Sequence, residues 1–147
     1  NGDPVMKKPT VDNYMTTKLV TLNKDMNVYF AIGLLLNNKI SGAPVIDDNN
    51  KLIGVLSEKD CLRIFADDSY LDVPITKTIM QGRGTVEQFM TTSIFTVNSG
   101  DDLFTVANIF LKNNFRRLPV MDGDIIVGQI SRRDVLKAIK DITGYKK

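Results

Sequence analysis

The chain has 147 residues, with 19 basic and 17 acidic side chains, no histidine and one cysteine, Cys61. The lack of histidine and of a second thiol excludes Ser-His-Asp triads, histidine- or thiolate-ligated metal sites and intramolecular disulfides. The near-balanced charge and the lack of an apolar run long enough for a membrane span favour neither nucleic acid nor membrane as a partner. We expect a cytoplasmic protein with no catalytic residues and no metal site, in which Cys61 is a buried hydrophobic residue.

The first half of the chain predicts a β-α-β-β-α order of elements. In chain order these are a capped turn at 10–15, a strand at 19–22, a helix at 27–38, hairpin strands at 45–46 and 52–56, and a helix at 57–65. Apolar residues recur in the first helix at the spacing of an amphipathic helix. Asp and Asn residues between the hairpin strands are typical of a turn. Gly33, inside the first helix, indicates close packing against a neighbouring element.

The second half of the chain repeats the first. Residues 14–17 (YMTT) recur 75 residues later as 89–92 (FMTT), and residues 54–60 (GVLSEKD) recur 74 residues later as 128–134 (GQISRRD). The order of the shared segments is kept, which indicates an internal duplication.

The duplication sets the predicted domain boundaries. We expect a first repeat at 10–65, a linker at 66–85 and a second repeat at 86–142. Each repeat is marginal in size for a core of its own, so the two should pack together. The elements predicted for the second repeat are a turn at 85–90, a strand at 95–97, a helix at 101–113, hairpin strands at 120–121 and 126–130, and a helix at 131–142.

Three motifs occur twice and in the same order. They are the openings at 14–16 and 89–91, the Pro-Val segments at 40–47 and 115–122, and the Gly-h-x-Ser-x-x-Asp segments (h is a hydrophobic residue) at 54–60 and 128–134. Together they resemble the CBS-domain pair, or Bateman module, over residues 11–142, although Gln129 departs from the usual hydrophobic residue. The resemblance implies an α/β (α+β) fold of tandem β-α-β-β-α repeats packed with pseudo-twofold symmetry.

The resemblance also implies two ligand clefts, each formed by the serine and aspartate of one repeat and the loop before the proline of the other. In such clefts the aspartate binds ribose hydroxyls, the serine and basic residues meet phosphate, and apolar segments flank adenine. Cleft A would combine Val55, Ser57, Lys59 and Asp60 with Phe95, Phe115, Arg116 and Arg117. Cleft B would combine Gln129, Ser131, Arg133 and Asp134 with Val20, Ile40, Ser41 and Gly42, and Thr16, Thr17 and Lys18 as further neighbours.

The residue types agree with these roles. A carboxylate can accept two hydrogen bonds from a vicinal diol, and a helix start favours a bound anion. The spacing alone also fits a serine N-cap followed by a first-turn acid. Because Arg116 and Arg117 replace Ser41 and Gly42, we expect cleft A to bind phosphate more strongly than cleft B.

The resulting hypothesis is a non-catalytic regulatory sensor of AMP, ADP or ATP, with Mg²⁺ held through bound phosphate as an option. S-Adenosylmethionine is an alternative ligand, and an interaction scaffold with degenerate clefts is an alternative role. Nucleic-acid binding through basic residues such as Arg116 and Arg132 would give strong salt dependence, but no nucleic-acid-binding motif accompanies them. No P-loop or nucleophile elbow indicates an enzyme. The resemblance further implies a homodimer of CBS pairs.

Overall fold

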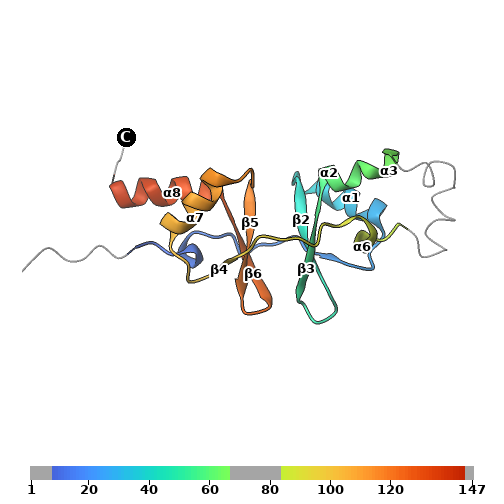
Figure 1. The fold of residues 1–147 in the computed structure, drawn as a ribbon, viewed down its shortest axis with the longest axis horizontal. Helices are drawn as coiled ribbons and strands as arrows, with labels where there is room; N and C mark the ends of the chain where they lie inside the picture. The colour runs from blue at the N-terminus through green and yellow to red at the C-terminus, as the bar shows by residue number, and fades with distance from the viewer. Residues whose placement is uncertain (1–7, 67–83, 145–147) are drawn as a thin grey trace, which may run out of the picture. The chain divides into compact units, whose positions relative to one another are not determined.

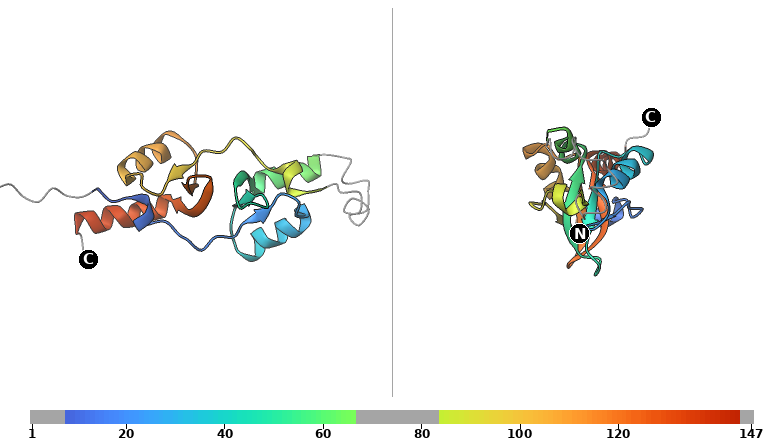
Figure 2. Two further views of the ribbon diagram at one scale, coloured as in Figure 1. Left: turned by 90° about the horizontal axis from the view of Figure 1, so that it is seen from below. Right: turned by 90° about the vertical axis from the view of Figure 1, so that its right-hand side faces the viewer.

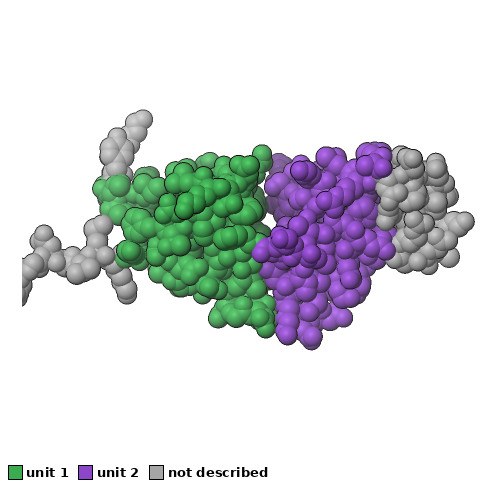
Figure 3. Space-filling view, viewed as in Figure 1, with its two compact units in different colours: residues 1–19, 95–147 green, residues 20–94 purple. Residues whose placement is uncertain are grey.

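The computed structural model describes residues 8–66 and 84–144. The chain divides into two compact units, which Figure 3 colours separately. Unit 1 comprises residues 1–19 and 95–147, and unit 2 comprises residues 20–94. The predicted linker falls almost wholly on residues 67–83, outside the described residues.

Unit 2 is a three-stranded sheet with helices (Figure 1). Its elements are β1 (Leu22–Asn23), α1 (Val28–Asn37), β2 (Gly42–Ile46), β3 (Leu52–Ser57), α2 (Glu58–Cys61), α3 (Arg63–Ala66) and α6 (Val86–Phe89). The strand order is β1-β2-β3, with β1 parallel to β2 and β2 antiparallel to β3. The Asn27 side chain begins α1 by accepting hydrogen bonds from the backbone N–H groups of Tyr29 and Phe30, which the first helical turn would otherwise leave unpaired.

Unit 1 repeats this architecture. Its elements are the 3-10 helix η1 (Val11–Asn13), β4 (Val97–Asn98), α7 (Leu103–Lys112), β5 (Arg117–Asp122), β6 (Ile125–Ser131) and α8 (Arg132–Thr143). The sheet order is β4-β5-β6, again with one parallel and one antiparallel pair. Asp102 caps α7, because its side chain accepts a 2.8 Å hydrogen bond from the Thr105 N–H. That bond is the largest contribution to the lowered pKa of Asp102.

The predicted helices and hairpins are confirmed in both repeats, with shifts at their ends. The first strand of each repeat lies further along the chain than predicted, at Leu22–Asn23 and Val97–Asn98, since only these residues pair with the following strand. The helix predicted at 57–65 is interrupted at Leu62, whereas its counterpart α8 runs without a break.

The prediction of close packing at Gly33 is wrong. A Cβ atom built on Gly33 would meet no atom within 4 Å. The glycine in α1 therefore has no packing reason within the described structure.

Each opening segment joins the sheet of the other repeat. Thr16 and Gln129 exchange two backbone hydrogen bonds of 2.9 Å, and Val55 and Thr91 exchange an equivalent pair. In Figures 1 and 2 the dark-blue N-terminal segment accordingly lies beside the orange and red elements of unit 1. The cores follow the same exchange: Val11 is fully buried with the second repeat, and α6 contributes buried residues to the first. Neither repeat therefore completes its core with its own opening segment.

Two of the duplicated motifs meet in this exchange. A Cβ atom on Gly54 would lie 2.5 Å from the Met90 Sδ, and one on Gly128 would lie 2.7 Å from the Thr16 carbonyl oxygen. Both distances are too short for a real Cβ contact, so the glycine of one motif makes room for the Met-Thr opening of the other repeat.

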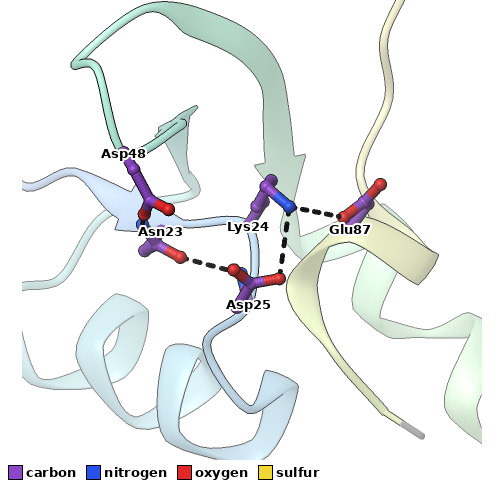
Figure 4. A network of polar contacts seen from close by, with 5 residues as sticks. All are labelled: Asn23, Lys24, Asp25, Asp48 and Glu87. Carbon is purple, nitrogen blue, oxygen red and sulfur yellow. Dashed lines mark hydrogen bonds and ion pairs between the residues drawn. The ribbon is translucent and has the colours of Figure 1, made fainter. Parts of the chain in front are cut away.

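A polar network attaches α6 to the loop after β1 (Figure 4). The Lys24 Nζ lies 3.4 Å from Asp25 Oδ1 and 3.6 Å from Glu87 Oε2, and these carboxylates raise the pKa of Lys24, with Asp25 contributing most. The Glu87 N–H also donates to the Lys24 carbonyl at 3.0 Å. The first turn of α6 thus finds backbone partners in a segment about sixty residues earlier in the chain.

Candidate functional site

The serine and aspartate of the third motif form the same capping box in both repeats. The Ser57 N–H donates to Asp60 Oδ2 at 2.9 Å, and the Asp60 N–H donates back to Ser57 Oγ at 3.1 Å. Ser131 and Asp134 repeat this pair at 2.9 Å and 3.2 Å. The N-cap interpretation that the spacing left open is therefore present in the geometry, and it holds each aspartate at a helix start.

The Asp60 carboxylate is enclosed by its own unit. Its Oδ1 accepts a 3.0 Å hydrogen bond from the Thr91 hydroxyl and lies 3.7 Å from Arg63 Nη2. The side chain is only 5% exposed. With Oδ2 committed to Ser57, both carboxylate oxygens have protein partners.

The Asp134 carboxylate is more open. Its Oδ2 accepts from the Ser131 N–H and from the Ser131 hydroxyl, at 2.9 Å and 3.0 Å. Within the described part of the chain, its Oδ1 has one polar neighbour, the Lys137 Nζ at 4.0 Å, and the side chain is 14% exposed. This aspartate borders a cavity of about 150 Å³. We call it the Asp134 pocket, and it is lined by Thr16, Arg117, Gln129, Ser131 and Asp134.

Strand register explains why these side chains converge. Arg117 on β5 pairs with Ser131 on β6, and Gln129 lies two residues before Ser131, so the three side chains share one face of the sheet. Thr16 reaches the same place because it pairs with Gln129. Unit 2 has the same register with different chemistry, since Gly42 pairs with Ser57 and Val55 stands where the second repeat has Gln129.

The remaining predicted ligand residues are distributed over both units. Among them, Phe95 and Phe115 lie in contact within unit 1, with ring centroids 5.5 Å apart. Lys59, Arg116 and Arg133 are exposed, and Val20, Ile40 and Ser41 are half-buried outside the strands and helices. Arg117, which the sequence analysis assigns to cleft A beside Asp60, lines the Asp134 pocket instead. Clefts A and B each require residues from both units, and that pairing stays a prediction.

Two features near Asp60 bear on its chemistry. Thr91 was not predicted to bond to Asp60, although it belongs to the duplicated Met-Thr motif, which was a usable signal. Burial, followed by the charges of Asp60 and Glu58, raises the pKa of the half-buried Cys61 thiol to about 11. The thiol is therefore almost entirely protonated at neutral pH, as expected for a packing residue.

Over residues 8–66 and 84–144, no three His, Cys, Asp or Glu side chains gather as a metal site. None of the helices in these segments could span a membrane.

The fold and the duplicated capping boxes agree with comparisons to known proteins. The sequence matches the CBS domain family twice, over residues 11–67 and 86–141. The chain belongs to the CBS-domain family. This CBS-domain protein is 34% identical to the chloroplastic CBS domain-containing protein CBSX2 of Arabidopsis thaliana, over 90% of this chain and 64% of CBSX2. It is 27% identical to protein MJ1225 of Methanocaldococcus jannaschii, over 88% of this chain and 42% of MJ1225.

A solved structure matches over most of the CBS pair. The crystal structure of CBSX2 in complex with AMP has a TM-score of 0.74 and 35% identity, covering 91% of this chain and 98% of that chain. The predicted fold class, two tandem CBS repeats, is therefore confirmed. The CBS pair spans less than two thirds of the length of both sequence relatives.

Proposed function

We propose that the chain is a non-catalytic regulatory CBS pair that binds an adenine nucleotide. The observation that carries the proposal is the Asp134 pocket, where a carboxylate oxygen, a guanidinium group and an amide converge at the start of α8. A carboxylate suits ribose hydroxyls, and a guanidinium group suits phosphate. The similarity to CBSX2, solved with AMP, supports the same ligand class here.

The proposed ligand sites are clefts A and B, each completed by residues of the other repeat. Bound ligand would favour one relative orientation of the repeats, and a regulated partner would respond to that shift in population. Mg²⁺ would accompany the phosphates of ADP or ATP. A cytoplasmic location remains part of the proposal, on the basis of the single unreactive thiol.

A ligand panel tests the proposed function. Isothermal titration calorimetry and thermal unfolding should be recorded with AMP, ADP, ATP, ATP plus Mg²⁺, and S-adenosylmethionine. We expect AMP to release heat on binding and to raise the melting temperature, because a ligand that binds only the folded state stabilises it. A larger binding heat and a larger rise in melting temperature with S-adenosylmethionine than with AMP would identify S-adenosylmethionine as the ligand. If none of these compounds binds, the chain would instead be an interaction scaffold with degenerate clefts.

We further propose a homodimer in which helix faces of two chains meet. Large apolar side chains are exposed on the helices of both units, and an apolar groove of about 490 Å³ lies along α7 and α8. These residues are Phe30, Leu36, Leu62 and Phe65 in unit 2, and Phe104, Leu111, Leu136 and Ile139 in unit 1. Exposed apolar faces of this kind are commonly covered when two copies of a chain associate.

Light scattering after size-exclusion chromatography tests the dimer. We expect twice the mass of the chain for the wild type and the mass of a single chain for Leu111→Asp, since a charge on the shared face cannot be buried. Ile125→Asp, at the β5–β6 hairpin, is the matched control and should leave the dimer intact. A wild type that elutes as a monomer at all concentrations would exclude this assembly.

A further inference from the structure

We infer that the Asp134 pocket is the dominant nucleotide site of the chain and that Arg117 and Gln129 make it specific for a phosphorylated nucleoside. The inference rests on the proposed function and reverses the order of affinities that the sequence predicts for clefts A and B. Its basis is the difference between the surroundings of Asp60 in unit 2 and those of Asp134 in unit 1. We call these two places the half-sites; both contain the same Ser-x-x-Asp motif.

Three side chains of the pocket have no protein partner. Among the described residues, the side chains of Thr16, Arg117 and Gln129, which line the pocket, form no hydrogen bond or ion pair. Asp134 Oδ1 lies 4.0 Å from the Lys137 ammonium group, its one polar neighbour in the described chain. The pocket therefore presents a cation, an amide and a hydroxyl beside an available carboxylate oxygen, all of which can bind a polar ligand.

The Ser131 hydroxyl is already occupied within the capping box. It accepts from the Asp134 N–H and donates to Asp134 Oδ2, at 3.2 Å and 3.0 Å, so it has no proton left for a phosphate oxygen. The remaining side-chain donors of the pocket are the Arg117 guanidinium group, the Gln129 amide and the Thr16 hydroxyl. Of these, only the guanidinium group carries a positive charge.

The pocket is smaller than a complete ligand site. Complete small-molecule sites measure about 300–1,000 Å³, whereas this cavity measures about 150 Å³. Its polar groups suit the sugar and phosphate end of a nucleotide, so the base would lie outside it. The required ligand class is a nucleoside phosphate with a vicinal diol.

The equivalent place in unit 2 lacks these groups. Gly42 and Val55 replace Arg117 and Gln129, and the Thr91 hydroxyl is bonded to Asp60. A Cβ atom on Gly42 would lie 3.1 Å from the Leu56 carbonyl oxygen, so a larger side chain there requires the hairpin to adjust. In unit 2 the carboxylate is buried and already hydrogen-bonded. The residues at the two equivalent positions, Gly42 and Val55, supply neither a cation nor an amide.

The test compares AMP with adenosine on matched variants. Arg117→Ala should weaken AMP binding by about tenfold or more, since it removes charge-assisted hydrogen bonds, while adenosine binding changes by less than about threefold. Gln129→Val, which installs the residue of the other repeat, should weaken AMP by about threefold to tenfold. Lys140→Ala removes an exposed positive charge from α8 outside the pocket and should leave both affinities unchanged. Far-UV circular dichroism checks the fold, and Arg117→Gln replaces Arg117→Ala if the latter unfolds.

The outcomes separate this inference from the proposed function. If wild type binds neither AMP nor adenosine, the proposed function fails. If wild type binds AMP but Arg117→Ala and Gln129→Val bind it equally well, the function stands and this inference is overturned. Equal losses of AMP and adenosine in Arg117→Ala would also overturn it, because the arginine would then not recognise phosphate.

Discussion

Asp60 and Asp134 occupy the same position in the two repeats, and each closes the same capping box with the serine three residues earlier. They differ in the second carboxylate oxygen. In unit 2 this oxygen accepts a hydrogen bond from the Thr91 hydroxyl. In unit 1 it lies 4.0 Å from the Lys137 ammonium group, and Asp134 lines a cavity. The duplicated motif therefore fixes the position of the carboxylate, and residues outside the motif decide whether it is available to a ligand.

The two aspartates consequently differ in function: one contributes mainly to stability and the other to ligand binding. The enclosed carboxylate of Asp60 connects β3, α2 and the segment after α6 within unit 2, so its main contribution is to stability. The Asp134 carboxylate has as many polar partners, but both of its hydrogen bonds come from Ser131 and converge on Oδ2. Its Oδ1 is therefore more available for binding. Substitutions at equivalent positions should therefore have opposite profiles in stability and affinity.

The largest expected effect concerns the glycines that admit the opening segments. Gly128→Ala should lower the free energy of unfolding by about 1–3 kcal/mol, because its Cβ would lie 2.7 Å from a backbone carbonyl oxygen. Gly54→Ala should cost less, since the nearest backbone oxygen is at 3.1 Å and the closer atom belongs to a flexible methionine. Urea denaturation measures both. Gly100→Ala, where a Cβ meets nothing within 4 Å, is the control. Three identical curves would contradict the exchange of segments.

The next effect separates stability from binding at the two threonines. Thr91→Val should lower the free energy of unfolding by about 1 kcal/mol, because a hydroxyl bonded to a buried carboxylate is lost. Thr16→Val should leave unfolding unchanged and weaken AMP binding, since Thr16 lines the pocket and its hydroxyl has no protein partner among the described residues. Thermal unfolding and calorimetry on the same samples measure both quantities. A loss of AMP affinity in Thr91→Val together with a loss of stability in Thr16→Val would contradict this comparison.

A smaller effect concerns the helices of the two units. Gly33→Ala in α1 should raise the free energy of unfolding by up to about 1 kcal/mol, through helix propensity alone. The equivalent residue of α7 is Asn108, whose side chain donates to the Phe104 carbonyl oxygen, so Asn108→Ala should gain less. Loss of stability in Gly33→Ala would indicate a close contact at α1 beyond the described chain, as in an assembly of two copies.

The smallest expected effect is at Cys61, which follows Asp60 directly. Its pKa of about 11 leaves on the order of one thiol in a thousand ionised at pH 8. Reaction with iodoacetamide should be slow and should accelerate about tenfold per pH unit up to that pKa. Saturating AMP should not change the rate if the ligand occupies unit 1. Strong protection by AMP would indicate that the ligand contacts unit 2.

The local elements could be predicted from the sequence because their causes are local. Apolar spacing predicted the helices, and polar residues at their starts, such as Asn27 and Asp102, cap them. The turns behave as expected too, since Asn50 and Gly123 adopt positive φ. The exchange of opening segments could not be predicted, because residues 14–17 and 89–92 are so alike that neither prefers one sheet by pattern. The hydrogen bond from Thr91 to Asp60 depends on that exchange. The difference between the surroundings of Asp60 and Asp134 could therefore not be predicted from the sequence either.

The most direct measurement is AMP titration of Asp134→Ala and Asp60→Ala, each with its unfolding curve. Asp134→Ala should lose at least about tenfold in affinity with little loss of stability, and Asp60→Ala should lose more stability and less affinity. A larger loss of affinity in Asp60→Ala, or equal losses in both, would contradict the account and restore cleft A as the principal site.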